Sequence, residues 1–244
     1  MPRAPEKSEV TLIAGRPARF RVRRSDRARR LTLRITHDDG LVVVLPRRMG
    51  RSEVARALSE HADWLDRQLE IYGVRQGPVR REVATGRQIP VLGEPRRLVV
   101  APLADGRVRT RIDLLGGTLE ARLPATRLLD PRPDLERWLR GLAREVITGR
   151  VLLLWPRVGV TPRKIVIGER ATRWGSCSHG GTLSFCYRLV MAPVGVIDAI
   201  VLHELCHLVH FDHSRRFHAL LREVCPDYPE QRAWLRAHAG ELTL

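Results

Sequence analysis

Hydrophobic and polar positions alternate along two long stretches of the chain, and this period-two pattern is typical of β-strands with one buried face. The first stretch covers residues 9 to 46, and the second covers residues 88 to 124. Short Gly- and Asp-containing segments within them predict tight turns between the strands. These turns are expected at Asp38-Asp39-Gly40, Gly93-Glu94, Asp105-Gly106 and Gly116-Gly117.

Other stretches repeat apolar residues every three or four positions, which predicts helices. One helix is expected from Arg51 to Tyr72 with Ser52 as its cap, and another from Asp130 to about Trp155. A short closing helix is expected over residues 229 to 242. Pro193 begins a further helix of about four turns, whose apolar stripe predicts that it is mostly buried. That stripe comprises Val194, Ile197, Val201, Leu205 and Leu208.

The buried helix carries the sequence His203-Glu204-Leu205-Cys206-His207, an HExxH motif. Histidines four residues apart on a helix lie on one face, roughly 6 Å apart, so both rings can reach one zinc ion. Glu204 is then well placed to act as a general base beside the metal. The motif predicts one Zn²⁺ ion and metal-assisted hydrolysis, most often of a peptide bond.

A zinc site of this kind needs a third protein ligand, and His213 is the candidate that we favour. It follows His207 by six residues, which is also the metzincin spacing, although His210 stands where that pattern has a helix-breaking glycine. Asp212 and Ser214 favour turns and caps, so they are candidates for supporting the loop that returns His213 to the metal.

Two other residues compete with His213 for the third position. His210 lies on the same helix face if the helix continues, but it would then be roughly 10.5 Å from His203 along the axis. Glu223 is a weaker rival from the next helix. Cys177, upstream of the motif, is an alternative ligand or reactive thiol.

The segments at Lys164–Ile167 and Leu183–Val190 are rich in β-formers, with a turn signal at residues 179 to 181 between them. We expect a hairpin beside the metal helix, whose edge could hold an extended substrate by strand addition. Arg173 and Tyr187 are candidates for stabilising an oxyanion, or for purely structural roles. Gly175 reads as a position of close backbone approach.

Taken together, three motifs resemble the YgjP-like (DUF45) zinc metallopeptidases, which are related to the SprT/WLM group and to M48-type peptidases. The motifs are the segment from Thr172 to Ser178 (TRWGSCS), the HELCH helix, and His213-Ser214 followed three residues later by Phe217. The resemblance implies His203, His207 and His213 as zinc ligands and Glu204 as the catalytic residue. One departure is Cys186, where the family usually has Asn.

Composition adds less than the motifs. The 244 residues carry a net charge of +16, but all except two of the 43 basic residues are Arg, which often reflects GC-rich coding. Nucleic acid is therefore a weakly supported partner. Four cysteines without a CxxC pair argue against a disulfide scaffold and a zinc ribbon and fit a reducing compartment. No apolar leader or long apolar run occurs, so we expect a cytoplasmic protein without membrane association.

These patterns predict an α+β protein. We expect a β-rich region over residues 1–128, with one helix, packed against a zincin-like domain over residues 129–244; we recognise no internal repeat. The predicted function is a zinc-dependent peptidase acting on a peptide or protein. A metal-dependent hydrolase of nucleoside triphosphates and a DNA-associated SprT-like protein are the alternatives. The sequence predicts neither the specificity nor the oligomeric state.

Overall fold

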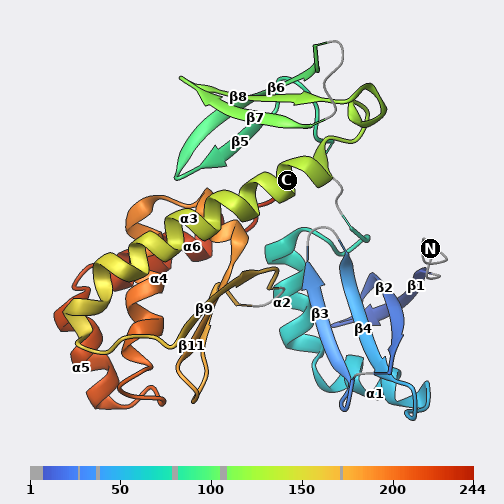
Figure 1. The fold of residues 1–244 in the computed structure, drawn as a ribbon. Helices are drawn as coiled ribbons and strands as arrows, with labels where there is room; N and C mark the ends of the chain where they lie inside the picture. Colours follow the sequence, from blue (N-terminus) through green and yellow to red (C-terminus); the bar gives the residue numbers. More distant parts are fainter. Residues whose placement is uncertain (1–7, 27, 37–38, 79–81, 105–108, 171–172) are drawn as a thin grey trace. The chain divides into compact units, whose positions relative to one another are not determined.

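The computed structural model describes residues 8–26, 28–36, 39–78, 82–104, 109–170 and 173–244, and it has mixed α+β architecture (Figure 1). The chain divides into two compact units, Met1–Arg81 and Glu82–Leu244. The sequence pattern predicted a boundary after residue 128, whereas this division falls between Arg81 and Glu82.

Unit 1 is a four-stranded sheet covered on one face by two helices. Its strand order is β1-β2-β4-β3, in which β2 and β4 are parallel and the other neighbours antiparallel. Leu41, Val43 and Leu45 of β4 pack with both helices in one core. The elements are β1 (Ser8–Ile13), β2 (Arg16–Ser25), β3 (Thr32–Thr36), β4 (Gly40–Pro46), α1 (Ser52–Glu60) and α2 (Ala62–Tyr72).

The helical stretch of unit 1 differs in detail from its prediction. It is two helices that meet at His61, not one helix over residues 51 to 72. Ser52 was also wrongly predicted as the cap, because Arg51 occupies that position and makes no side-chain cap hydrogen bond. Of the turn predicted at residues 38 to 40, Asp38 lies outside the described residues, and Gly40 begins β4 with φ +66°.

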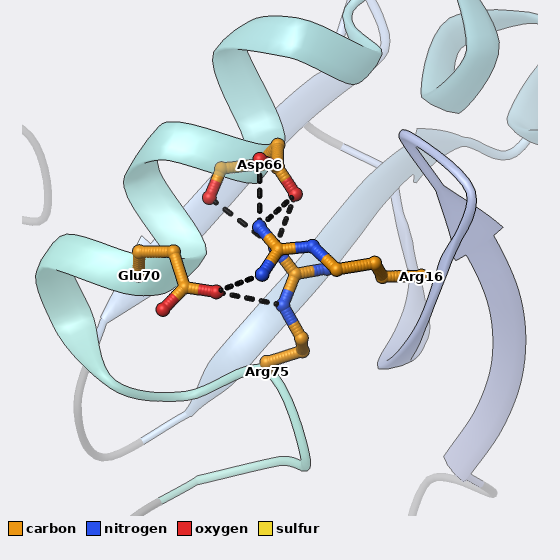
Figure 2. A network of polar contacts seen from close by, with 4 residues as sticks. All are labelled: Arg16, Asp66, Glu70 and Arg75. Atoms are coloured by element: carbon orange, nitrogen blue, oxygen red, sulfur yellow. Dashed lines mark hydrogen bonds and ion pairs between the residues drawn. The ribbon is translucent and has the colours of Figure 1, made fainter.

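A polar network ties the β1–β2 turn of unit 1 to α2 (Figure 2). The Arg16 guanidinium lies 2.8 Å from a carboxylate oxygen of Asp66 and 2.9 Å from one of Glu70. Arg75 pairs with the same two carboxylates, at 3.2 Å from Glu70. The hydrogen bond from Arg16 is the main cause of the lowered pKa of Asp66. Both arginines are thereby matched by acidic groups within their own unit.

Unit 2 begins with a second four-stranded sheet, in the order β5-β6-β8-β7, followed by a long helix. The turn expected at Gly93-Glu94 lies one residue earlier, at Leu92-Gly93, and the one at residues 105 and 106 lies outside the described residues. The elements are β5 (Gln88–Val91), β6 (Glu94–Pro102), β7 (Arg111–Leu115), β8 (Thr118–Leu123), η1 (Ala125–Arg127) and α3 (Arg132–Val158).

A small three-stranded sheet and three further helices complete unit 2. The hairpin predicted between the segments of β9 and β11 is wrong, because β9 runs parallel to β11. The antiparallel partner of β11 is β10. Residues 187 to 191 form a 3₁₀ helix and not the end of a strand. The elements are β9 (Lys164–Gly168), β10 (Gly175–Cys177), β11 (Thr182–Cys186), η2 (Tyr187–Met191), α4 (Val194–Cys206), α5 (Arg215–Val224) and α6 (Tyr228–His238).

The sheet β5–β8 belongs with the downstream elements because its first turn docks on them. Leu92 N donates to Val190 O at 2.8 Å, and Gly93 N donates to Met191 O at 3.1 Å. A Cβ at Gly93 would lie 2.8 Å from Pro193 Cα, so only glycine permits this contact. This docking braces the residue that precedes α4. It is also the physical reason why the unit boundary precedes this sheet.

Candidate metal centre

Helix α4 (Val194–Cys206) carries the HExxH motif at its C-terminal end. Its bounds confirm the predicted buried helix, and its residues are buried on nearly all sides. The helix ends at His207 without the expected glycine, because Val209 N and His210 N both donate to Cys206 O, at 3.1 and 2.9 Å. Ordinary backbone hydrogen bonds therefore make the turn that leaves the helix.

The loop after α4 returns the chain to the motif and places His213 just before α5 (Arg215–Val224). Ser214 caps α5, since its hydroxyl accepts a hydrogen bond from Phe217 N at 3.4 Å. Asp212 Oδ1 accepts a hydrogen bond from Ser214 N at 3.3 Å, and the Ser214 hydrogen bond lowers the pKa of Asp212. Asp212 and Ser214 thus fix the turn that carries His213.

The three histidines converge. One nitrogen from each of His203, His207 and His213 lies within 4.8 Å of the other two. The Nε2 atoms of His203 and His213 are 3.5 Å apart. Nδ1 of His207 lies 3.0 Å from the backbone oxygen of His210, so it donates there and leaves Nε2 free to coordinate. The rivals His210 and Glu223 are not part of this group.

Aromatic packing holds the rings in place. Phe217 stacks on His207, with ring centroids 4.5 Å apart, and meets His203 edge-on at 5.1 Å. Tyr228 stacks on His203, with ring centroids 5.3 Å apart. Nδ1 of His203 is buried with no hydrogen-bond partner among the described residues, so this ring is oriented by packing and by the contact of its Nε2 with His213.

The electrostatics of the cluster suit a metal. Burial lowers the pKa of His203 to about 3, helped by the neighbouring His207 and His213. Burial also lowers the pKa of His207. Both rings are therefore neutral near pH 7, as a coordinating imidazole must be. Three imidazole nitrogens that lie this close together fit the donor set that zinc prefers.

Glu204 lies beside this cluster with 5 % of its surface exposed. Burial raises the pKa of its carboxyl to about 7, against the opposing effect of the Arg173 charge. The carboxylate packs on β10, where a Cβ added at Gly175 would lie 2.5 Å from Oε1 of Glu204. The close approach expected at Gly175 is thus an approach to Glu204, a partner that the sequence did not identify.

A cavity of about 390 Å³ opens over the histidines and Glu204. Phe211, which no sequence pattern indicated, also lines the cavity, and its ring stacks on His179 of the β10–β11 turn with centroids 4.3 Å apart. Burial, with the nearby Glu204 charge, raises the pKa of the Cys177 thiol to about 11, so this thiol stays protonated. The lining residues are Arg173, Gly175, Ser176, Cys177, His203, Glu204, His207, Phe211 and His213.

Two residues singled out from the sequence lie elsewhere. Tyr187 is buried in η2, with the Arg140 guanidinium 4.1 Å from its ring centroid, and it does not line the cavity. This position favours a structural role. Cys186, which stands where the family usually has Asn, is also buried, with Sγ 3.7 Å from Arg170 O. Its side chain does not line the cavity.

Comparison with known proteins places these features in a family. The family model for the YgjP-like metallopeptidase domain matches residues 29–238, which cover most of the chain. No curated protein and no solved structure matches. Within the described residues, no helix is long and apolar enough to cross a membrane.

Proposed function

The chain belongs to the YgjP-like metallopeptidase family, and we propose that it hydrolyses peptide bonds with one zinc ion held by His203, His207 and His213 in a zincin-like arrangement. One observation carries this proposal. Three imidazole nitrogens within 4.8 Å of one another share a cavity with a buried carboxylate. That combination supplies both the donors for a metal and a group that can take a proton.

When bound, zinc supplies Lewis-acid polarisation of a carbonyl and lowers the pKa of a water molecule. The role of Glu204 is to accept a proton at its carboxylate and pass it to the leaving amine. Its pKa of about 7 lies near neutral pH, where a general base is most effective, and a bound cation would draw that value down. Contact with Gly175 fixes the position of the carboxylate.

Arg173 is the cationic side chain of the cavity lining. Its charge already acts on Glu204, as the effect on the Glu204 pKa indicates. We propose that Arg173 helps to hold the substrate carbonyl oxygen while negative charge develops on it. The side chain is exposed in the absence of substrate, so it can turn toward a bound chain.

Strand β10 (Gly175–Cys177) offers an edge for an extended substrate, since among the described strands it pairs with β11 alone. Ser178 N donates to Thr182 O, and Cys186 N donates to Trp174 O. In an antiparallel pair the bonded residues alternate, so the backbone groups of Gly175 and Cys177 face away from β11. A peptide that adds there would lie beside Glu204.

The test compares hydrolysis of a mixed peptide library and of nucleoside triphosphates by the zinc-loaded protein and by Glu204→Gln. Glu223→Gln is the matched control, because Glu223 is an exposed carboxylate outside the histidine group. We expect peptide cleavage that Glu204→Gln abolishes and Glu223→Gln leaves intact. Cleavage of phosphoanhydrides without cleavage of peptides would overturn the proposal.

A further inference from the structure

The two four-stranded sheets have the same topology, although each belongs to a different unit (Figure 1). In each, the first two strands form a hairpin, the second and fourth are parallel, and the third is antiparallel to the fourth. An α-helix follows each sheet, α1 in unit 1 and, after η1, α3 in unit 2. The orders β1-β2-β4-β3 and β5-β6-β8-β7 are therefore equivalent.

The correspondence extends to single residues. Phe20 pairs with Leu41 in one sheet and Leu98 with Leu119 in the other, so both sheets use the same register. The first hairpins turn at Ala14-Gly15 and Leu92-Gly93, where all four residues have positive φ. A proline stands two residues after the glycine of each turn, and Leu-Pro stands at the end of each fourth strand. The two sheets thus repeat one topology and register, although no internal repeat was expected from the sequence.

The copies differ most on the sheet face that points away from the core. In unit 1, Arg19, Arg21 and Arg23 alternate along β2 with core residues, so they share this outer face. Arg34 of β3 lies on it as well, and Val42 of β4 stands between Arg21 and Arg34. We name these four arginines the arginine face.

The same positions in unit 2 carry balanced charge. Arg97 and Val99 replace Arg19 and Arg21 on β6. On β8, Arg122 pairs with Glu120 at 2.9 Å, and on β7, Arg111 pairs with Asp113 at 2.7 Å. Both copies come from one chain with one codon preference. Arg-rich coding alone therefore does not explain why one face is purely cationic.

The arginine face is also poor in partners. Among the described residues, Arg21 pairs with Asp39, while Arg19, Arg23 and Arg34 form no ion pair. By contrast, Arg16 and Arg75 are neutralised by the network in Figure 2. Unit 1 contains 19 basic and 10 acidic residues in a third of the chain, so its charge density exceeds that of unit 2.

We propose that the arginine face binds the phosphodiester backbone of nucleic acid without reading its sequence. One guanidinium group can donate two parallel hydrogen bonds to the oxygens of one phosphate. Alternate residues on a strand are roughly 6.6 Å apart, so the arginines of β2 form a linear array of such groups. The face presents no aromatic side chain for stacking on bases, so the contacts are to phosphate.

A membrane surface fits less well, because membrane-binding faces insert apolar side chains into the bilayer. Val42 and Val44 of the outer face are only 5 % and 7 % exposed, so they offer little apolar surface for insertion. The exposed Val10 and Leu12 are two apolar residues at the rim of the same outer face, on the edge strand β1, where Val10 pairs with Arg19. A separate cavity of about 630 Å³ at the end of β4 is lined by Arg29, Arg47 and Arg48, of which Arg47 pairs with Asp26 at 2.8 Å.

The test measures binding of a fluorescein-labelled DNA duplex of about 20 base pairs by anisotropy, between about 50 and 200 mM salt. The test variant is Arg19→Gln/Arg23→Gln/Arg34→Gln. The matched control, Arg97→Gln/Arg111→Gln/Arg122→Gln, removes the same charge from the other copy. We expect the test variant to bind at least about tenfold more weakly and to lower the slope of log affinity against log salt by about 2 to 3, with the control close to wild type.

Thermal unfolding of both variants establishes that they fold. Equal weakening of both variants would overturn the proposal, since it would mean that net charge alone attracts DNA. Failure of the wild-type protein to bind would overturn it too. The proposal would also be overturned if the test variant alone lost binding to vesicles containing phosphatidylserine while its binding to DNA was unchanged. Glu204→Gln is expected to bind DNA normally, which separates this inference from the proposed hydrolysis.

Discussion

The carboxylate of Glu204 rests directly on the backbone of Gly175, with no room for a side chain between them. A Cβ on Gly175 would lie 2.5 Å from Oε1 and 2.6 Å from Cγ of Glu204. The φ angle of Gly175 is not positive, so close approach and not backbone conformation requires glycine here. The strand β10 and the helix α4 thereby set the position of the candidate base together.

Gly175→Ala should displace the Glu204 carboxylate and leave the histidines in place. We expect kcat to fall about 100-fold, because small misplacements of a reacting group are costly. Zinc content, measured by mass spectrometry, should stay at the wild-type level. Gly180→Ala is the control in the same hairpin, since the nearest atom to a Cβ there is Ser178 Oγ at 3.9 Å. Equal activity in the two variants would contradict this account.

His213→Ala should weaken zinc binding, because it removes one of three converging donors. Competition with a chelator is expected to show that the affinity for zinc falls at least about 100-fold. Removal of a residue that only hydrogen-bonds to a metal ligand already costs up to about that much. His210→Ala is the matched control: it removes the rival ring but keeps the carbonyl that accepts from His207. A greater loss in His210→Ala than in His213→Ala would reverse the assignment.

Gly93→Ala should destabilise unit 2 more than an ordinary glycine substitution in a turn. Its Cβ would meet Pro193 at 2.8 Å and would sit at φ +84°, so we expect a loss of about 3 kcal/mol in the free energy of unfolding. Gly116→Ala shares a positive φ but has nothing within 4 Å, so about 1 kcal/mol is expected. Denaturant titration measures both, and equal losses would argue against the docking contact.

Asp134, buried in the first turn of α3, accepts hydrogen bonds from Thr110, Arg127 and Arg137 at 2.8 to 2.9 Å. Burial acts to raise its pKa, but these hydrogen bonds and the Arg127 charge together lower it. Asp134→Asn should therefore lose about 1 to 3 kcal/mol in the free energy of unfolding at neutral pH. A lowered pKa stabilises the fold above the unfolded value of about 3.9, so the difference should shrink as pH falls below it.

The control for that experiment is Asp113→Asn, which breaks the more exposed pair with Arg111. Its cost should not exceed about 1 kcal/mol. Unfolding curves at several pH values distinguish the two variants. If Asp134→Asn lowers the free energy of unfolding as much at low pH as at neutral pH, the charge of Asp134 is not what stabilises this turn.

Much of the fold could be predicted from local patterns. The alternation in residues 9 to 46 and 88 to 124 gave strands where β1–β8 are found, and the apolar spacing before the motif gave α4. The convergence of His203 and His207 follows from helix geometry alone. The cap at Ser214 followed from the turn preference of serine and is confirmed by its bond with Phe217 N.

Other features depend on tertiary contacts that no local pattern contains. The sequence placed β11 in a hairpin with β9, but the chain instead returns through β10, and register decides the partner. The contact between Gly175 and Glu204 joins residues 29 positions apart. The repeat was missed because its copies share a register and turns rather than identical side chains.

The most direct test of the zinc site is a crystal structure of the zinc-loaded protein with anomalous diffraction recorded on both sides of the zinc edge. We predict one anomalous peak at the cavity, with Nε2 of His207 and nitrogens of His203 and His213 about 2.0–2.1 Å from it. A peak coordinated by His210 or Cys177 in place of His213, or no peak at the histidines, would contradict the account.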